Sequence, residues 1–337
     1  MDLFPRILVI RFSSIGDIVL ATSALTTIRS SFPNGHITFM TLHPFESLLE
    51  YHHHIDSIIP LRKTSSILYH IQVGKFIKKN EYDIVFDLHN SLRSRLIGIF
   101  LNQKVIRLRK PRWKRWLLFY FYSNKFLENF NSRLMYHQHL GKIWKEGDQI
   151  PNTSLIVTEM EKKLARKYIK KSGISKNYVV MIPGAAWIQK QWSSNKFAGL
   201  ANSLKEMKKL DTVLIGSAKD YICFDIEKEV PEVLNLAGKT DLRQALAFLS
   251  NAKRVIGGDT GLVHAAEALN VPVSMILGPT SRETGGGVSL IESREIAVKN
   301  LWCRPCSQNG SRKCYRSKQI CMELITEDQV YDTVSTG

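Results

Sequence analysis

The chain has 337 residues, of which 44% are hydrophobic and 23% are charged. This composition excludes an intrinsically disordered chain, and the length predicts about two domains of roughly 150 residues each. The formal net charge of +17 favours anionic partners such as nucleic acid, an anionic membrane or a polyanionic substrate. No apolar run reaches the roughly 18 residues of a membrane span, and no signal peptide is evident at the start, so we expect a cytoplasmic protein.

Short apolar runs alternate with helical patterns in the first half of the chain. Residues 7–10 predict a buried strand, and residues 17–31 predict a helix that Pro33 and Gly35 end. Further strands are predicted at residues 36–41, 55–61 and 82–89. Buried strands that alternate with helices predict a parallel sheet with crossover helices.

The alternation fades between residues 109 and 176. Residues 104–115 carry seven basic side chains and no acid, and Trp113 and Trp116 are interleaved among them. The basic residues are Lys104, Arg107, Arg109, Lys110, Arg112, Lys114 and Arg115. An aromatic and aliphatic run follows as far as Tyr122, and residues 159–171 then predict a helix.

The alternation restarts in the second half, which predicts a second sheet of the same kind. Strands are predicted at residues 178–182, 212–215, 233–236, 254–256 and 271–277, with a serine-capped helix at 194–210 and a capping box at 326–329. We therefore predict an α/β protein of two doubly wound, Rossmann-like domains that face a central cleft. The expected boundaries are 1–155, a connecting helix at 156–176, a second domain at 177–325 and a last helix at 326–337.

Ligands of such sheets bind beyond the carboxyl ends of the strands, so the loops there are the candidate sites. In the first loop, Gly16 permits a tight turn, and Ser13 and Ser14 offer hydroxyls. Asp17 stands at the start of a helix, where the helix dipole favours its ionised form. It is either a general base at the floor of the cleft or a residue that only caps the helix.

Two loops of the second half offer features of an anion site. Gly184 follows the first strand there and allows a ligand to approach the backbone, and Lys190 can neutralise a diphosphate unless it is only a solvated loop lysine. Residues 257–264 combine three glycines with a helix N-terminus, which presents backbone N–H groups to phosphate. In that segment Asp259 can accept hydrogen bonds from sugar hydroxyls, and His264 is either a ligand contact or a structural histidine.

A fourth loop, at residues 87–95, follows the last predicted strand of the first half. Arg93 and Arg95 can bind anionic groups with forked hydrogen bonds, and Arg62 and Lys63 follow another strand end. These four side chains form either a basic wall for an anionic substrate or ordinary surface charges.

Four of the five cysteines lie close together near the C-terminus: Cys303, Cys306, Cys314 and Cys321. In a cytosolic chain this spacing indicates either a closed structural zinc site or thiols that are reduced or joined in a disulfide. Cys223 stands alone.

Taken in chain order, these loops resemble one family. The motifs are Arg-x-Ser-Ser-x-Gly-Asp at 11–17, Pro-Gly-Ala at 183–185, Lys190 before Trp192, Gly-Ser-Ala-Lys-Asp at 216–220, Leu-Ala-Gly at 236–238, Asp-Thr-Gly-Leu-x-His at 259–264 and Gly-Pro-Thr at 278–280. This order is similar to that of the lipopolysaccharide heptosyltransferases of glycosyltransferase family nine.

The resemblance implies a fold of the GT-B class and an inverting transfer of heptose from ADP-heptose, without a divalent metal or other cofactor. It implies that Asp17 is the base for the acceptor hydroxyl, with Ser13, Ser14, Gly16 and the basic wall on the acceptor side. On the donor side it implies that Lys190 holds the diphosphate, with Gly184, Ser217, Asp220, Asp259, Thr260, Gly261 and His264 as further donor contacts.

The resemblance also implies an anionic glycolipid acceptor, namely the Kdo or heptose of the lipopolysaccharide inner core, and a peripheral position on the inner face of the inner membrane. Residues 107–122 then suit an element at the lipid headgroups, although an ordinary helix with core aromatics is the alternative. Another nucleotide sugar or acceptor on the same fold is a second possibility. A nucleic-acid-binding protein with a zinc site is a distant one, because no RNA- or DNA-binding module is recognisable, and we expect no nucleic-acid partner.

Overall fold

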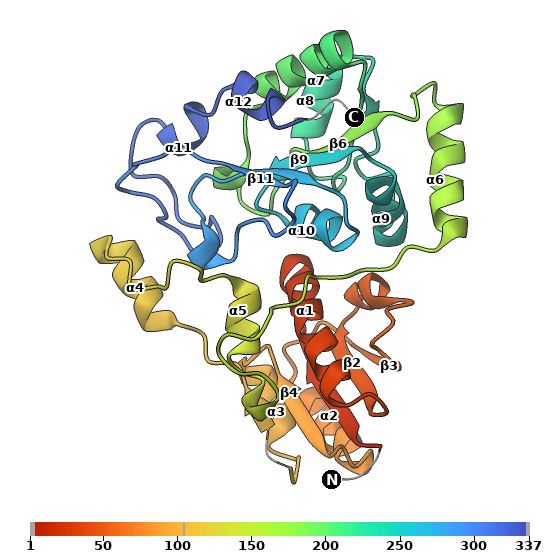
Figure 1. Cartoon of the computed structure of the whole chain (residues 1–337), viewed down its shortest axis with the longest axis vertical. Coiled ribbons are helices and arrows are strands. Elements are labelled where there is room, and N and C mark those ends of the chain that lie inside the picture. Colours follow the sequence, from red (N-terminus) through yellow and green to blue (C-terminus); the bar gives the residue numbers. More distant parts are fainter. Residues whose placement is uncertain (1–3, 104, 335–337) are drawn as a thin grey trace. The chain divides into compact units, whose positions relative to one another are not determined.

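The computed structural model describes residues 4–103 and 105–334 (Figure 1). The chain divides into two compact units: unit 1 is Met1–Pro111 with Ser132–Ile156, and unit 2 is Arg112–Asn131 with Val157–Gly337. Within the described ranges, no helix combines the length and the apolar character needed to cross a bilayer.

Unit 1 is built on a parallel sheet with the strand order β3-β2-β1-β4-β5. Residues 7–10 of the central strand are completely buried, because a parallel strand is covered on both faces by crossover helices. The elements of this unit are β1 (Arg6–Ile10), α1 (Ile15–Ser31), β2 (His36–Leu42), η1 (Phe45–Leu49), β3 (Ser57–Leu61), α2 (Ile67–Lys79), β4 (Ile84–Asp87), α3 (Leu92–Gly98), β5 (Val105–Arg107), α5 (Ser132–His137) and η2 (Gly141–Ile143).

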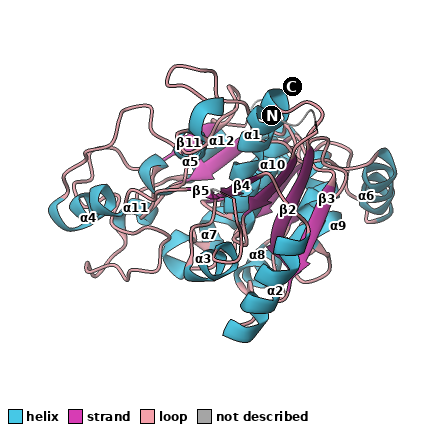
Figure 2. Ribbon diagram, turned by 90° about the horizontal axis from the view of Figure 1, so that it is seen from below, coloured by secondary structure: helices cyan, strands magenta, loops and turns pink. Residues whose placement is uncertain are grey.

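Unit 2 is built on a second parallel sheet, with the order β11-β10-β9-β6-β7-β8. Figure 2 gives a view from below, in which β2 and β3 of the first sheet lie side by side. Its core includes Trp192, Phe197 and the fully buried thiol of Cys223. The elements are α4 (Arg112–Phe121), α6 (Glu159–Lys171), β6 (Tyr178–Ile182), η3 (Ile188–Lys190), α7 (Ser194–Lys208), β7 (Asp211–Leu214), α8 (Ile222–Glu229), β8 (Leu234–Asn235), α9 (Leu242–Ser250), β9 (Arg254–Gly258), α10 (Gly261–Ala268), β10 (Val273–Ile276), η4 (Arg282–Thr284), β11 (Arg294–Ile296), α11 (Ile320–Glu323) and α12 (Glu327–Tyr331).

Both sheets have the same doubly wound topology. In unit 1 the chain runs outward from β1 to β2 and β3, then returns to the other side of β1 as β4. In unit 2 it runs outward from β6 to β7 and β8 and returns beside β6 as β9. The strand order changes direction between the first strand and the strand that returns beside it. The loops that follow these two strands diverge and leave room for a ligand at the carboxyl edge of the sheet. The reversals therefore lie at β1/β4 and at β6/β9.

The prediction of two doubly wound α/β halves is confirmed, and each predicted strand is present, although β3 begins at Ser57 rather than at residue 55. Two short edge strands, β5 and β11, were missed because each has three residues and no continuous apolar run. The capping box at 326–329 opens α12, with Thr326 and Gln329 bonded to each other's backbone N–H groups. The last helix was predicted at 326–337, but α12 ends at Tyr331, and residues 335–337 lie outside the described residues.

One segment differs from the predicted domain division. The sequence analysis placed residues 112–131 in the first domain, whereas their contacts lie within unit 2. Arg115 Nε donates to the carbonyl of Glu283, and Asn124 donates to the carboxylate of the same residue. Local sequence does not reveal this, because both contacts join α4 and the residues after it to a turn more than 150 positions away.

Candidate active-site halves in the two units

Asp17 lies at the carboxyl edge of the first sheet, next to the β1/β4 reversal. Its Oδ2 lies 2.7 Å from Nη2 of Arg11 and accepts hydrogen bonds from the N–H of Ser14 at 3.2 Å and its hydroxyl at 3.1 Å. These contacts all fall on Oδ2, and the side chain is 43% exposed. One carboxylate oxygen of Asp17 is thus held by its neighbours, and the side chain is accessible to solvent. This arrangement fits both predicted roles, the helix cap and the general base.

The charge state of Asp17 follows from these contacts. Burial opposes ionisation, but the ion pair with Arg11 and the donors of Ser14 outweigh it, so the pKa of Asp17 lies below its usual value. Arg11 is itself buried, and its other terminal nitrogen donates to the carbonyl of Leu88 at 2.8 Å. Asp17 is therefore ionised at neutral pH, and Arg11 joins the loop after β1 to the loop after β4.

The loop after β4 is organised by a buried carboxylate. Asp87 accepts hydrogen bonds from the N–H groups of His89 and Asn90 and turns the chain sharply. His89 packs against the ring of Phe12 with centroids 5.0 Å apart. Burial, followed by the nearby charge of Arg11, lowers the pKa of His89 to about 3, so this imidazole is neutral in the folded protein. Asp87 thus shapes the loop.

The other predicted acceptor residues lie at the same edge but do not gather into one group. Gly16 is buried in the first turn of α1, and Ser13 is half-buried beside it. Arg93 is half-buried in the first turn of α3, and exposed Arg95 donates to the side chain of Asn90 at 2.8 Å. Arg62 and Lys63 are exposed after β3, whereas Arg93 and Arg95 follow β4. Because β2 and β1 lie between β3 and β4, the predicted basic wall is divided into two pairs.

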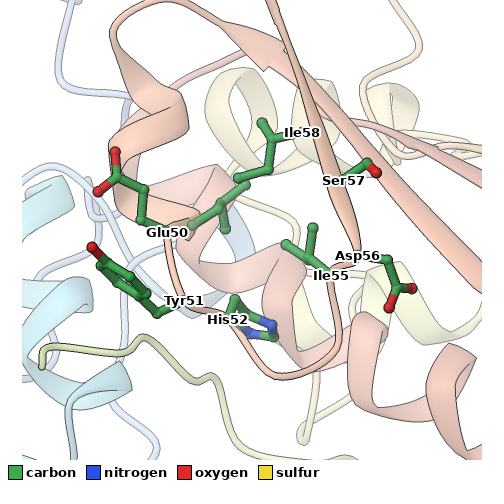
Figure 3. A pocket seen from close by; sticks show the side chains of 8 residues that line it. Glu50, Tyr51, His52, Ile55, Asp56, Ser57 and Ile58 are labelled. Atoms are coloured by element: carbon green, nitrogen blue, oxygen red, sulfur yellow. The ribbon is translucent and has the colours of Figure 1, made fainter.

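A hollow of about 400 Å³ occurs elsewhere in unit 1 (Figure 3). The hollow opens beside Ser57, the first residue of β3. It therefore lies at the amino-terminal edge of the sheet, whereas Asp17 lies at the carboxyl edge. Burial first, then the charges of His54 and His53, lower the pKa of His52 in its wall to about 4. The lining residues are Leu49, Glu50, Tyr51, His52, Ile55, Asp56, Ser57 and Ile58. No predicted site residue is among them.

In unit 2, the loops after β6 and β9 meet through Lys190 and Asp259. The ammonium group of Lys190 donates to the backbone carbonyl of Asp259 and lies 3.5 Å from its Oδ2. His264 Nε2 lies 3.3 Å from the other carboxylate oxygen. Only 12% of each side chain of the ion pair is exposed. The sequence analysis named all three residues, and the structure brings them together.

The Asp259 carboxylate is held in its ionised form. Burial opposes its ionisation, but the hydrogen bond from His264 and the charge of Lys190 outweigh burial and lower the pKa of Asp259 well below its usual value. The interpretation of Lys190 as a solvated loop lysine is therefore wrong. The lysine is a largely buried cation whose present partner is an anion, and a diphosphate is the kind of group that can compete for it.

The N-terminus of α10 adds donors to the same place. Thr260 is the N-cap, and Gly261 is the first helical residue. The first N–H groups of a helix have no partner inside the helix and attract anions. The hydroxyl of Thr260 and Nδ1 of His264 are buried and make no hydrogen bond to any described residue. A polar ligand at this helix N-terminus can form hydrogen bonds with both atoms.

The loop after β7 lies against the loop after β6. A side chain at Gly184 would place its Cβ 2.2 Å from Cγ of Asp220, so only glycine permits this approach. Oδ2 of Asp220 accepts hydrogen bonds from the N–H and the hydroxyl of Ser217 at 2.6 and 2.9 Å. Asp220 therefore closes the turn at 216–220, and the exposed Ser217 stands at its start.

The cysteine-rich segment, residues 302–321, packs on these loops. Arg304 donates to the carbonyls of Gly278 and Thr280, and Gln319 donates to the carbonyl of Gln189 at 2.5 Å. Gly310 lies against Lys190: an added Cβ would be 2.6 Å from Cγ of the lysine. The segment therefore supports the loop that carries Lys190.

The thiols of Cys303, Cys306, Cys314 and Cys321 line one small cavity of about 20 Å³. Burial, followed by the neighbouring thiols, raises the pKa of Cys306 to about 11. Across residues 4–103 and 105–334, no three His, Cys, Asp or Glu side chains are grouped closely enough to hold a metal ion. The four cysteines form no disulfide with one another, and the zinc alternative stays a prediction.

Sequence reasoning missed several residues that these contacts single out. Arg11 was quoted only as part of a motif, although a buried arginine needs an anionic partner and Asp17 follows six positions later. Tyr136, whose hydroxyl donates to the backbone carbonyl of Asp17 at 3.3 Å, comes from distant α5 and leaves no local signal. Gly310 and Arg304 were likewise hidden within the cysteine-rich segment.

Comparisons with known proteins identify the family of this chain. The sequence model of glycosyltransferase family 9 (heptosyltransferase) matches residues 70–315. The lipooligosaccharide heptosyltransferase 2 of Haemophilus ducreyi is 27% identical over 299 residues, which cover 82% of this chain and 84% of that protein.

Two solved structures share the fold over nearly the whole chain. The glycosyl transferase family 9 structure from Veillonella parvula has a TM-score of 0.78 at 20% identity. The match covers 99% of this chain and 97% of the Veillonella chain. The Escherichia coli ADP-heptose LPS heptosyltransferase II has a TM-score of 0.74 at 23% identity and covers 97% of each chain. Because the family model spans well over half of the sequence, this chain is an enzyme that belongs to glycosyltransferase family 9, the heptosyltransferases.

Proposed function

We propose that this enzyme transfers heptose from ADP-heptose to the inner core of lipopolysaccharide, onto Kdo or a preceding heptose, with inversion at the anomeric carbon. The observation that carries the donor assignment is the buried group of Lys190, Asp259 and His264 at the N-terminus of α10. It sits at the β6/β9 reversal of a family 9 glycosyltransferase, where this topology binds nucleotides.

On the donor side, the ammonium of Lys190 and the N–H groups at Gly261 bind the diphosphate. Negative charge grows on the leaving phosphate oxygen as its bond to the sugar breaks, and fixed donors in a buried site stabilise that charge. Lys190 exchanges its contact with Asp259 for the phosphate, and the freed carboxylate and His264 bind sugar hydroxyls. Gly184 lets the ligand approach the backbone, and the turn at Ser217 and Asp220 lies beside the nucleoside.

On the acceptor side, Asp17 takes the proton of the attacking hydroxyl. The acceptor oxygen forms a bond to the anomeric carbon of the heptose, the bond from that carbon to the diphosphate breaks, and ADP leaves with the electron pair. The proton ends on the Asp17 carboxylate. It binds to Oδ1, because the contacts with Arg11 and Ser14 all involve Oδ2. Ser13, Ser14 and Gly16 adjoin the acceptor, and Arg62, Lys63, Arg93 and Arg95 attract its anionic groups.

The acceptor is an anionic glycolipid, and we place the enzyme peripherally on the cytoplasmic face of the inner membrane. The net charge of +17 supports this, because a strongly basic protein concentrates at an anionic surface.

A transfer assay tests the function. Purified enzyme is incubated with ADP-heptose and truncated core acceptors ending in Kdo or in heptose, and the products are read by mass spectrometry. A mass gain of one heptose on either acceptor supports the proposal and identifies the position made. Transfer from a different nucleotide sugar in a parallel panel, with none from ADP-heptose, would show instead that the fold serves another donor.

A further inference from the structure

The helix α4 exposes an unusual number of aromatic side chains. Of its ten residues only Leu118 is buried, while Trp113 is 67% exposed and Tyr120 and Phe121 are each 60% exposed. The sequence analysis left open whether these rings belong to a core, and the structure shows that they do not. A short helix with so little buried surface gains little from packing, so its exposed face calls for a partner.

The rings form a connected surface that extends beyond the helix. On α4, Trp113 and Trp116 stack at 4.7 Å, and Trp116 lies 4.9 Å from Phe121. Immediately after the helix, Tyr122 contacts Trp302 at 4.9 Å, and Trp302 lies 6.1 Å from Tyr315. The rings of α4 therefore continue into the cysteine-rich segment of the same unit, beside which α4 is drawn in Figure 1.

Arg312 joins the two parts of this surface, and Arg316 packs within the second part. Arg312 lies over the ring of Tyr120 at 5.0 Å and donates to the backbone carbonyl of Phe119 at 3.3 Å. Arg316 lies over Trp302 at 5.5 Å. We name this the aromatic surface, and it consists of Trp113, Trp116, Tyr120, Phe121, Tyr122, Trp302 and Tyr315 with Arg312 and Arg316.

The charges around the aromatic surface all have one sign in both contributing segments. Residues 105–127 and 296–322 contain arginines and lysines but no aspartate or glutamate. Arg112, Lys114, Arg312 and Lys313 are exposed among the rings. Glu283 contacts the first segment, and its carboxylate accepts hydrogen bonds from Asn124 and Ser281. The surface is thus complementary to a dense layer of negative charge.

We propose that the aromatic surface docks the enzyme on an anionic lipid bilayer. Tryptophan and tyrosine rings favour the headgroup level, where an apolar body and a polar edge are both satisfied, and the arginines and lysines pair with lipid phosphates. Phe121 supplies a purely apolar ring that gains from the acyl boundary. The inference deepens the proposed function and rests on it for the identity of the membrane, but the docking is measurable without sugar transfer.

The test is co-sedimentation of the full chain with vesicles. We expect binding to phosphatidylethanolamine vesicles that contain about one third phosphatidylglycerol, weaker binding at high salt, and little binding to phosphatidylcholine alone. Replacing one ring from each segment, in Trp113→Ser with Trp302→Ser, should lower the partition coefficient about tenfold or more, since each exposed ring loses its buried area. Arg312→Glu should lower it about 5- to 30-fold by reversing one charge.

Matched controls come from exposed side chains outside the aromatic surface. Phe76→Ser removes a 55% exposed ring from α2, and Lys167→Glu reverses an exposed charge on α6. Both controls should bind vesicles within about twofold of wild type, because neither side chain is a member of the aromatic surface. Thermal unfolding of each variant establishes that the fold is kept.

The inference is overturned if the wild-type chain does not bind anionic vesicles, or if the surface variants bind as well as the controls. It is also overturned if single-stranded RNA binds through these rings and vesicles do not. A water-soluble truncated acceptor separates docking from catalysis. The single variant Trp113→Ser, which lies on α4 and outside the segment that supports Lys190, should use this acceptor at the wild-type rate and be impaired only with acceptor embedded in vesicles. Vesicle binding without any sugar transfer would reject the proposed function and leave the docking surface in place.

Discussion

Nη2 of Arg11 lies 2.7 Å from Oδ2 of Asp17, and the same buried guanidinium donates to the carbonyl of Leu88. One arginine therefore orients the candidate base and joins the two loops on either side of the β1/β4 reversal. The pairing also keeps the carboxylate ionised across the neutral pH range, because it lowers the pKa of Asp17.

Asp17→Asn should remove most of the turnover, by a factor of about 10² to 10⁴, because a positioned base contributes that much to rate. Affinity for ADP, measured by calorimetry, should be unchanged. Asp56→Asn is the matched control, since Asp56 is also a half-exposed carboxylate of unit 1 paired with an arginine, Arg29, at 2.6 Å. Near-normal turnover of the Asp17 variant would refute its assignment as the base.

Lys190→Ala should weaken the binding of ADP by about 10- to 100-fold, which is the effect of losing one hydrogen bond between charged groups. Calorimetric titration with ADP measures this directly. Lys228→Ala removes an 80% exposed lysine of the same unit and should leave the affinity at the wild-type value. Equal ADP affinities for the two variants would contradict the role of Lys190.

Gly310→Ala should weaken ADP binding several-fold without abolishing it, because the added Cβ would meet Cγ of Lys190 at 2.6 Å and displace the lysine. The backbone at Gly310 has a positive φ of +85°, so alanine also introduces strain of about 1 kcal/mol. Gly173→Ala separates the two effects: its φ is +76°, but nothing lies within 4 Å of the added Cβ. Both variants should lose similar stability, and only the first should lose affinity.

The ion pair of Glu161 and Arg243 predicts how stability depends on pH. Two hydrogen bonds from Arg243, at 2.8 and 2.6 Å, are the main reason that the pKa of Glu161 falls to about 2. A carboxyl whose folded-state pKa is lowered stabilises the fold above its usual pKa of about 4.3, and this contribution disappears as pH falls toward 2.

Glu161→Gln should therefore cost about 2 kcal/mol in the free energy of unfolding at pH 7, measured by urea denaturation. The difference from wild type should shrink steadily between about pH 4.5 and pH 2. Glu159→Gln, on the same turn but 79% exposed, should change little at either pH. A pH-independent deficit in the Glu161 variant would mean that its packing, not its charge, matters.

The thiol of Cys306 should react slowly with iodoacetamide in the folded protein. Its pKa of about 11 leaves far less thiolate at pH 8 than an ordinary cysteine has, so we expect labelling at least about 100-fold slower than that of free cysteine. Mass spectrometry before and after denaturation measures the two rates. Stoichiometric zinc in the purified protein, with fast labelling only after chelation, would support the zinc alternative instead.

Much of the fold was predictable because it depends on local pattern. Residues 7–10 and 178–182 are continuous apolar runs, and such runs bounded by turns form the buried strands of parallel sheets. The candidate residues after those strands were also predictable, since the carboxyl edge of a doubly wound sheet is where loops bind ligands. Asp17, Lys190 and Asp259 all lie at such an edge.

The sequence by itself thus determined the two α/β halves, the family and the loops that carry the chemistry. Only the tertiary structure decided that Lys190 pairs with Asp259, that Arg11 holds Asp17, and that Gly310 lies against Lys190. It also decided that α4 joins unit 2 and that its rings continue into Trp302 and Tyr315. The physical reason is that hydrophobic periodicity reports on neighbours along the chain. Most of these contacts join residues that are 13 to 180 positions apart, and their approach depends on how the elements pack.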